Sequence, residues 1–263
     1  MDLGLKGKRV MVAAASKGLG RAVAAEFVGE GARVAICSRD LERISRVAEE
    51  LGGGTIAIRA DVSTEEGCRA FVSEATGALG GIDVLVVNAG GPRPGRFVDL
   101  DDAAWQQAVE LTLFSAVRLT RLALSELRRS KGAIVFSTST SVRQPGAPAY
   151  GTLILSNAIR AAVHGLLKTL ATELAPDGIR VNAVQPGRIS TERVAELDAD
   201  AARREGVPIE QVRQRFERGA IPLGRYGKPE EFAAAVAFIA SPRASYITGV
   251  SLQVDGGMLT GIW

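Results

Sequence analysis

Short apolar runs rich in Val, Ile and Ala alternate along the chain with longer segments in which apolar and charged residues follow the helical period. The runs predict strands, because β-branched residues favour extended backbone. The predicted strands are Arg9–Ala13, Arg33–Cys37, Thr55–Arg59, Val84–Val87, Ala133–Ser137, Arg180–Val184 and Val250–Val254. The predicted helices are Gly18–Gly29, Leu41–Leu51, Glu65–Ala78, Asp102–Arg129, Leu155–Leu174 and Pro229–Ala240.

The predicted strands are near-continuous apolar runs rather than runs that are apolar at every second position, which indicates burial on both faces. Strands and helices follow one another with short connections, and this order is typical of a parallel sheet. We therefore predict an α/β fold in three layers, a doubly wound parallel sheet of about seven strands with helices on both faces. Ligands are expected beyond the carboxyl ends of its strands.

One stretch, about 188–225, is long and charged, and we expect an irregular lid or substrate-binding segment there. No linker divides the chain, so residues 1–263 are expected to form a single dinucleotide-binding domain that carries this segment. Hydrophobic residues make up 46% of the sequence and the net charge is only +3, which excludes a disordered protein.

Other protein classes are excluded by what the sequence lacks. No apolar run approaches the roughly 20 residues of a membrane helix, and the N-terminus is not that of a secretory signal. Positive charges are scattered among negative ones, so no basic stripe points to nucleic acid. Cys37 and Cys68 form neither a CxxC pair nor a Cys/His cluster, and we expect a cytoplasmic protein without a metal site.

The turn after the first predicted strand, Ala13-Ala14-Ala15-Ser16-Lys17-Gly18-Leu19-Gly20, opens a helix. Glycines in such a turn let the backbone approach a pyrophosphate, and the helix N-terminus supplies N–H donors and the positive end of the dipole. A tight strand–helix turn without a ligand is the alternative.

Together with further segments, this turn resembles the short-chain dehydrogenase/reductase family, in particular its β-ketoacyl-carrier-protein-reductase-like members. The family's Rossmann turn, T-G-x-x-x-G-x-G, corresponds here to A-A-A-S-K-G-L-G. The further segments are Asp61-Val62, Asn88-Ala89-Gly90, Pro186-Gly187-Arg188-Ile189-Ser190-Thr191, Gly227-Lys228-Pro229-Glu230-Glu231, Thr248-Gly249 and Asp255-Gly256-Gly257. They follow in the family's order and spacing over nearly the whole chain.

The resemblance implies a nicotinamide cofactor. Arg39 ends the second strand where an NAD site needs a carboxylate for the ribose 2′-hydroxyl, and Lys17 adds a second cation. Both favour NADP(H) over NAD(H), with solvated surface charges as the alternative. The residues implied to bind the cofactor are Ser16, Lys17, Gly18, Leu19, Gly20, Arg39, Asp61, Val62, Asn88, Ala89, Gly90, Pro186, Gly187, Ile189 and Thr191.

Two positions of the cofactor motifs depart from the family pattern. Ala14 stands at the first glycine of the turn, and Val87 stands at the first Asn of the usual N-N-A-G. A methyl group is tolerated where φ is negative and costs free energy where φ is positive. We expect weakened cofactor affinity from these departures.

The family's catalytic Tyr-x-x-x-Lys pair has no counterpart. Counting back without a gap from Gly165–Glu173, which matches the family, puts Arg160 at the Lys position and Ser156 at the Tyr position. An alignment with a gap would put Asn157 and Leu153 there. Thr112 stands at the family's Asn, and the catalytic Ser is retained as Ser139 within Ser137-Thr138-Ser139-Thr140-Ser141.

The replacements change the chemistry. Arg160 keeps a positive charge that can fork onto ribose hydroxyls or an anion, but its pKa above about 12 prevents proton relay. Tyr150 is a candidate replacement acid, and an aromatic side chain at a subunit contact is the alternative. His164, the only histidine, shares a helix face with Ser156 and Arg160, either as part of a relay or as a packed side chain. The expected catalytic residues are Ser139, Tyr150, Ser156 and Arg160.

Four arginines belong to loops expected at the carboxyl end of the sheet, and they suggest an anionic substrate or an acyl carrier, with solvated loop charge as the alternative. They are Arg93, Arg96, Arg143 and Arg188. The alanine-rich stretch Ala158–Ala162 suits helix packing across a subunit boundary, as in the tetramers that the family forms.

We therefore expect an NADP(H)-dependent oxidoreductase of the 3-oxoacyl-reductase-like kind, with atypical catalytic residues. Its substrate is expected to be a small carbonyl or alcohol compound, and its assembly a homotetramer or dimer. The alternative is a nucleotide-binding regulatory or catalytically inactive protein that retains the dehydrogenase fold.

Overall fold

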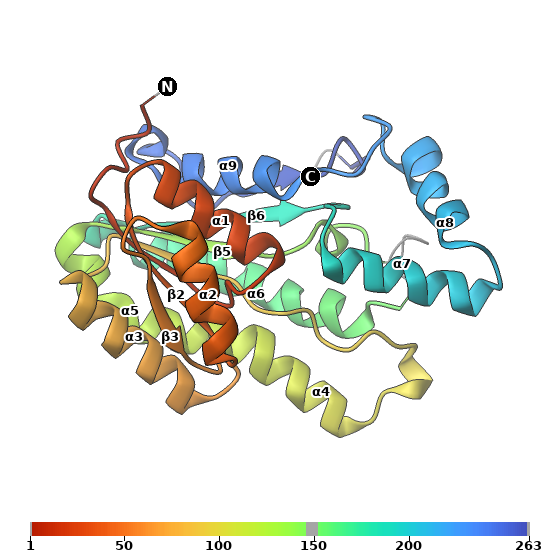
Figure 1. Cartoon of the computed structure of the whole chain (residues 1–263), viewed down its shortest axis with the longest axis horizontal. Coiled ribbons are helices and arrows are strands. Elements are labelled where there is room, and N and C mark those ends of the chain that lie inside the picture. The colour runs from red at the N-terminus through yellow and green to blue at the C-terminus, as the bar shows by residue number, and fades with distance from the viewer. Residues whose placement is uncertain (1, 146–151, 262–263) are drawn as a thin grey trace.

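A seven-stranded sheet forms the centre of the computed structural model, which describes residues 2–145 and 152–261 (Figure 1). The strands are β1 (Arg9–Val12), β2 (Arg33–Ser38), β3 (Ile56–Arg59), β4 (Val84–Val87), β5 (Ala133–Ser137), β6 (Arg180–Pro186) and β7 (Ser251–Val254). They lie in the order β3-β2-β1-β4-β5-β6-β7, and every neighbouring pair is parallel. The predicted doubly wound α/β fold is thus confirmed.

The strand order reverses between β1 and β4, and this reversal positions a ligand cleft. After β1 the chain builds the sheet outward to β3, and it then returns to place β4 on the other side of β1. The connections that leave β1 and β4 diverge at this point, so their carboxyl ends border an open crevice.

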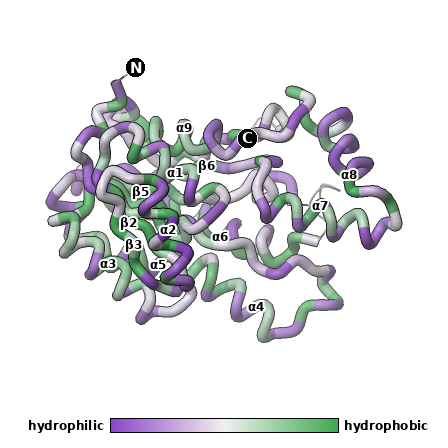
Figure 2. Tube along the Cα trace, in the orientation of Figure 1, coloured by the Kyte–Doolittle hydropathy of each residue, from purple (hydrophilic) through white to green (hydrophobic). Residues whose placement is uncertain are grey.

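Helices cover both faces of the sheet (Figure 1). One face packs against α1 (Gly18–Gly29), α2 (Leu41–Leu51) and α9 (Pro229–Ala240), and the other against α3 (Glu65–Leu79), α5 (Ser115–Ser130) and α6 (Ile154–Glu173). The strands alternate between the two cores: Val10 and Val12 belong to one cluster, and Met11 and Ala13 to the other. Because the centre of the sheet is buried on both sides, β4 and β5 are almost entirely hydrophobic. Figure 2 shows hydrophobic residues concentrated in the sheet.

The helix predicted over Asp102–Arg129 is interrupted. The structure has α4 (Asp102–Val109), a π-helical turn at Glu110–Phe114, and then α5. At this turn the Ser115 hydroxyl donates a 2.6 Å hydrogen bond to the Leu111 carbonyl, which an ordinary helix would pair with a backbone N–H. The wider turn rephases the helix faces, and Leu111 lines the cleft as a result.

The expectation that 188–225 is irregular was wrong. This segment contains α7 (Glu192–Glu205), α8 (Ile209–Arg215) and a π-helical turn at Phe216–Ala220. The side chain of Thr191 caps α7 by accepting a hydrogen bond from the Val194 N–H, and Gly206, with φ +66°, ends the helix in the left-handed region. Both helices project beyond the carboxyl edge of the sheet (Figure 1).

Candidate functional site

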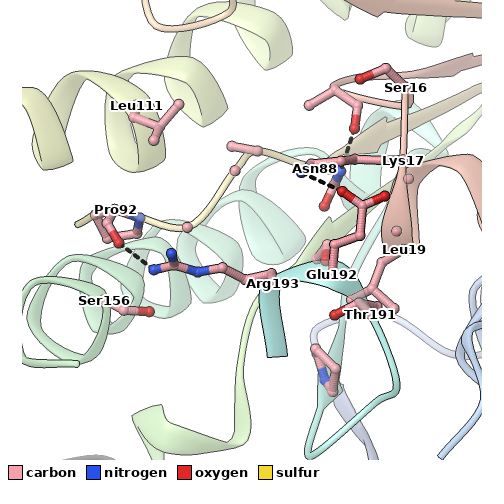
Figure 3. A pocket seen from close by; sticks show the side chains of 18 of the residues that line it. Ser16, Lys17, Leu19, Asn88, Pro92, Leu111, Ser156, Thr191, Glu192 and Arg193 are labelled. Carbon is pink, nitrogen blue, oxygen red and sulfur yellow. Dashed lines mark hydrogen bonds and ion pairs between the residues drawn. The ribbon is translucent and has the colours of Figure 1, made fainter. Parts of the chain in front are cut away.

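A cleft of about 650 Å³ opens at the carboxyl ends of the central strands. The structure brings to its walls all the residues that the sequence assigned to cofactor binding, together with Ser139, Ser156 and Arg160. Tyr150 lies outside the described residues. Figure 3 shows the middle of the cleft, with the turn after β1 on one side and α6 on the other.

The turn after β1 forms one end of the cleft. Lys17, at the N-cap of α1, gives no side-chain hydrogen bond to the N–H groups of the first helical turn, so these donors remain available to an anion. Gly20 is required by a close approach: a Cβ there would lie 2.5 Å from the Ala14 carbonyl oxygen and 2.8 Å from Asn88 Nδ2. The open donors and the narrow backbone fit the diphosphate of a dinucleotide.

Ala14 adopts the left-handed conformation, with φ +50°. The family motif resembled by this turn has glycine at the position, and an alanine there costs about 1 kcal/mol of strain. Asn88 helps to hold the turn, because its Nδ2 donates hydrogen bonds of 3.2 and 3.1 Å to the carbonyl oxygens of Ala13 and Ala14. The departure from glycine is therefore accommodated in the fold at the expense of strain.

The end of β2 provides the next part of the wall. Arg39 is exposed and follows Ser38, whose hydroxyl is bonded within the turn to the backbone of Asp40. Asp61 Oδ1 accepts hydrogen bonds from the N–H and hydroxyl of Ser63, at 3.0 and 2.7 Å, and thereby orders the start of α3. In this part of the wall, Arg39 and Arg43 offer the cleft positive charges without a carboxylate partner among the described residues, and Arg39 lies directly at the end of β2.

Arg160 lies on the floor at the other end of the cleft and is only 9% exposed. Its Nη1 donates a 2.8 Å hydrogen bond to the Ser137 carbonyl, and its Nε lies 3.3 Å from Ser156 Oγ. Burial, together with the charge of Arg193, lowers the pKa of the guanidinium to about 10. It therefore stays protonated at neutral pH, as a buried cation without a carboxylate partner within the described part of the chain.

The hydroxyl groups of Ser139 and Thr112 differ in their surroundings. Ser139 Oγ lies 2.9 Å from Ser141 Oγ and accepts from the Ser141 N–H, which fixes it at the rim of β5. Thr112, placed by sequence at the family's Asn position, is buried within the π-helical turn, and its hydroxyl has no hydrogen-bond partner among the described residues. Leu111, its neighbour, lines the cleft instead.

His164 does not continue a relay from Ser156 and Arg160. Its Nε2 lies 3.0 Å from Thr138 Oγ1 and 3.3 Å from Gln185 Nε2. Burial, Arg143 and Arg160 lower the pKa of the imidazole to about 4, so it is neutral at pH 7. The packed side chain is the alternative that the geometry favours.

The four loop arginines do not gather around the cleft. Arg96 pairs with the Asp99 carboxylate, Arg93 donates to the Asp99 carbonyl, and Arg143 donates to the Ser251 carbonyl. Arg188 lines the cleft but forms a buried 2.7 Å ion pair with Asp198 on α7. Each guanidinium contacts a carboxylate or carbonyl group near it, and this explains why the four arginines do not form a binding site for an anionic substrate.

Sequence reasoning missed two residues in the first turn of α7 that cross the cleft. Glu192 forms a 2.7 Å ion pair with Lys17, and Arg193 Nη2 donates a 2.7 Å hydrogen bond to the Pro92 carbonyl (Figure 3). The signal that could have found them is the run Thr191-Glu192-Arg193, where an N-cap residue precedes an acidic first turn. Such a start would have placed both side chains beside the cleft.

The described residues form neither a metal centre nor a membrane-spanning helix. Among the described residues, no group of His, Cys, Asp and Glu side chains is arranged to hold a metal ion. Within the same part of the chain, no helix combines the length and apolar character needed to cross a membrane.

Comparisons with known proteins place the chain in a family. The family described as Enoyl-(Acyl carrier protein) reductase matches residues 13–259. An uncharacterized short-chain type dehydrogenase/reductase of Sinorhizobium fredii is 33% identical over 97% of this chain and 98% of its own length. The 3-oxoacyl-(acyl-carrier-protein) reductase FabG of Aquifex aeolicus is 33% identical over 98% of this chain and 100% of its own.

Solved structures agree with these relatives. L-sorbose reductase from Gluconobacter frateurii, complexed with NADPH and L-sorbose, superposes with a TM-score of 0.92 at 33% identity, covering 100% of both chains. The 3-ketoacyl-(acyl-carrier-protein) reductase from Brucella melitensis, complexed with NADH, gives 0.85 at 32% identity, covering 97% of this chain and 99% of its own. With its parallel sheet, glycine-bearing turn and cleft at the point where the strand order reverses, this chain belongs to the short-chain dehydrogenase/reductase family.

Proposed function

We propose that the protein is an NADP(H)-dependent oxidoreductase that interconverts a carbonyl compound and the corresponding alcohol. The observation that carries the proposal is the shared cleft: the turn Ser16–Gly20, the segment Asn88–Gly90 and the loop Pro186–Thr191 face one cavity of about 650 Å³. Relatives that act on such compounds, L-sorbose reductase and FabG among them, span essentially the whole chain. The bound nicotinamide would supply or accept the hydride.

The preference for NADP(H) is assigned to Arg39. Its side chain is exposed at the end of β2, where the resemblance places the ribose 2′-position. Lys17, the second cation expected there, is paired with Glu192, and its contribution therefore depends on release from that ion pair. An arginine without a carboxylate partner in the described structure suits a 2′-phosphate, whereas a 2′-hydroxyl is ordinarily held by Asp or Glu.

The chain's own polar groups suggest how the reacting oxygen is held. The Ser139 hydroxyl stands at the carboxyl end of β5 and can donate a hydrogen bond to a substrate oxygen. Arg160 supplies a fixed positive charge at the same end of the cleft, and in a low-dielectric cleft the attraction of such a charge for an anionic group is strong. Ser156 positions the guanidinium through its contact with Nε. We further propose that Tyr150 donates the proton.

Cofactor choice is tested by titrating the protein with NADPH and NADH and following nucleotide fluorescence. We expect NADPH to bind roughly 10- to 100-fold more tightly, because a charge-assisted hydrogen bond is made only to the 2′-phosphate. Arg39→Asp should reverse the preference. Arg46→Asp is the matched control, because Arg46 is an exposed cation on α2 that pairs with Glu42 and lies outside the cleft. Equal affinity of the unmutated protein for both nucleotides would contradict the assignment.

The proton donor is tested by comparing two variants with a panel of carbonyl compounds. Tyr150→Phe should lower turnover by about 10²–10⁴-fold, the contribution of a positioned acid, whereas Ser156→Ala should change it much less. Equal, small effects of both substitutions would show that the proton comes from another source.

A nucleotide-binding regulatory protein is the second candidate function. It is favoured by Ser156 and Arg160, which stand one helical turn apart on α6 and cannot transfer protons at neutral pH as a Tyr–Lys pair does. NADPH binding without turnover of any carbonyl compound, at every pH tested, would establish this function in place of the oxidoreductase.

We also propose a homo-oligomer, tetrameric or dimeric, that works in the cytoplasm, with 188–225 as the lid of a single domain. Exposed apolar side chains at the β7 edge and on α9 support an assembly: Phe238, Tyr246, Val250 and Leu252. Cys37 and Cys68 are buried free thiols, which suits a reducing compartment. Sedimentation equilibrium gives the assembly directly, and a monomer at micromolar concentration would contradict it.

A further inference from the structure

Two cationic side chains from different elements face the same end of the cleft. Arg160 rises from the floor on α6, and Arg193 reaches over from the first turn of α7. Figure 3 shows the Arg193 guanidinium stretched across the cleft from α7 toward Pro92, with Ser156 of α6 below it. This end lies away from the phosphate turn, so the two charges are distinct from that of Lys17 in the turn.

The charge of Arg160 lacks compensation in the described structure. Its hydrogen-bond partners are one carbonyl oxygen and one hydroxyl, and no carboxylate of the described residues lies within 4 Å. Arg180, another largely buried arginine, donates instead to three carbonyl oxygens at the end of α9, on Ile239, Ala240 and Ser241. A buried cation is costly unless it is paired or fully hydrogen-bonded, and Arg160 is neither.

Arg193 adds a second charge, which the surrounding residues neutralise only in part. Its Nη2 donates to the Pro92 carbonyl, and Gly91 lets it pack close, since a Cβ at Gly91 would lie 3.0 Å from Nε. Among the described residues, the carboxylate paired with it is that of Glu196, which is 3.6 Å away and largely exposed. The repulsion between the two guanidinium groups is part of what lowers the pKa of Arg160. An anion between them would relieve it.

We propose that Arg160 and Arg193 together bind a carboxylate of the substrate, so that the protein acts on oxo acids and hydroxy acids in preference to neutral ketones and alcohols. This inference rests on the proposed oxidoreductase function and names its substrate class. Guanidinium groups bind a carboxylate through paired N–H donors, which gives both charge and orientation. The hydroxyl of Ser139 lines the same cleft and remains available to the reacting oxygen.

The test uses the full-length protein loaded with NADP⁺, which cannot donate a hydride, and three oxo acids as probes: 2-oxopentanoate, 3-oxopentanoate and 4-oxopentanoate, each beside its methyl ester. Binding is measured by titration calorimetry, independently of turnover. At least one acid should bind about 10- to 100-fold more tightly than its ester, because only the acid presents a charge to the guanidinium pair. The position of its oxo group then measures the spacing between the carboxylate site and the reacting carbon.

Variants separate the carboxylate site from general charge effects. Arg193→Met should remove about 10- to 100-fold of the acid's affinity and leave the ester's unchanged, and Arg193→Lys should restore part of it. Arg93→Met is the matched control, because Arg93 loses the same charge on the neighbouring loop but donates to the Asp99 carbonyl outside the cleft. Arg160→Met should act as Arg193→Met does.

The outcomes distinguish this inference from the proposed function. Acid binding that depends on Arg193, with no hydride transfer to any compound, would support the carboxylate site and refute the oxidoreductase. Turnover of neutral ketones with no preference for acids would overturn the carboxylate site and leave the oxidoreductase standing. A loss of NADPH affinity in Arg193→Met as large as the loss of acid affinity would assign the charge to the nucleotide and also overturn the inference.

Discussion

Arg160 and Arg188 line the same cleft and are almost equally buried, at 9% and 8% exposed, but their surroundings differ. Arg188 pairs with Asp198 at 2.7 Å, and its guanidinium carbon lies 3.7 Å from the centroid of the Phe216 ring. Within residues 2–145 and 152–261, the hydrogen-bond partners of Arg160 are only a carbonyl and a hydroxyl. The charge of the first arginine is paired within the fold and ties the loop after β6 to α7, although its Nε has no hydrogen-bond partner among the described residues. The second retains a charge that a ligand can use.

The Asp198 carboxylate is buried beside Arg188, and this burial makes its charged form costly. Burial raises the pKa of Asp198, and the charge of Arg188 with a hydrogen bond from the Tyr226 hydroxyl only partly opposes this rise. The pKa of Tyr226 is raised as well, mainly by burial. The carboxylate partner, and not the degree of burial, therefore distinguishes the structural Arg188 from Arg160, which is available to a ligand.

The largest expected effect is a loss of stability when Arg188 is deprived of its carboxylate partner. Asp198→Asn leaves Arg188 buried without a countercharge, and we expect a loss of about 3–5 kcal/mol in the free energy of unfolding. Urea denaturation measures it. Asp200→Asn, which removes only exposed ion pairs with Arg203 and Arg204, should cost less than about 1 kcal/mol. Similar losses for the two variants would contradict the distinction.

The next effect is a dependence of stability on pH that arises beside Arg160. The pKa of His164 is about 4 in the folded protein and about 6.5 when unfolded. The unfolded chain therefore binds more protons between these values, and stability is lost as the pH falls from 6.5 toward 4. Because the ring is half-buried and water screens part of the charge, we expect about 1 kcal/mol between pH 7 and pH 5.

His164→Gln is the control for this pH effect. The difference in unfolding free energy between the variant and the unmutated protein should shrink as the pH falls, since the variant has no imidazole to protonate. Asp198, whose pKa is raised, contributes with the opposite sign at lower pH in both proteins, so it cancels in the difference. A difference that stays constant from pH 7 to pH 5 would contradict the assignment.

The smallest expected effect on stability follows from removing Arg160, the arginine that is available to a ligand. In Arg160→Met the charge beside His164 is lost, so the imidazole pKa should rise, while the free energy of unfolding should stay within about 1 kcal/mol of the unmutated value. Because the chain has a single histidine, its NMR titration is unambiguous. In Arg188→Met the pattern should reverse, with an unchanged imidazole pKa and a clear loss of stability.

The sequence predicted the sheet well because its strands are buried on both faces. Runs such as Val84–Val87 and Ala133–Ser137 carry their apolar character locally, and the observed bounds agree with the predicted ones. The helices of 188–225 were missed because charged residues dominate α7 and few of its positions are buried, so no apolar stripe marks it. The π-helical turn at Glu110–Phe114 was missed because a single side-chain bond from Ser115 marks it.

The site divides in the same way. The residues of the phosphate turn are adjacent in sequence and could be read from their spacing. The capping run at Thr191 could have placed Glu192 and Arg193 beside the cleft, but it could not reveal their contacts with Lys17 and Pro92, because these contacts join segments far apart in the chain. The pairing of Arg188 with Asp198 likewise depends on how α7 folds back, so sequence left open whether that arginine was free.

Asn88 has a consequence for the direction in which a dinucleotide can lie. Its amide nitrogen is committed to the carbonyl oxygens of Ala13 and Ala14, so the side chain has only Oδ1 left, which accepts hydrogen bonds and cannot donate them. A sugar hydroxyl can donate to such an atom, and a phosphate oxygen cannot. The N–H groups at the start of α1 have the opposite preference. Donors and an acceptor thus lie next to each other at the phosphate turn, since a Cβ at Gly20 would lie 2.8 Å from Asn88 Nδ2, and this polarity would orient a bound nucleotide before any part of its base is recognised.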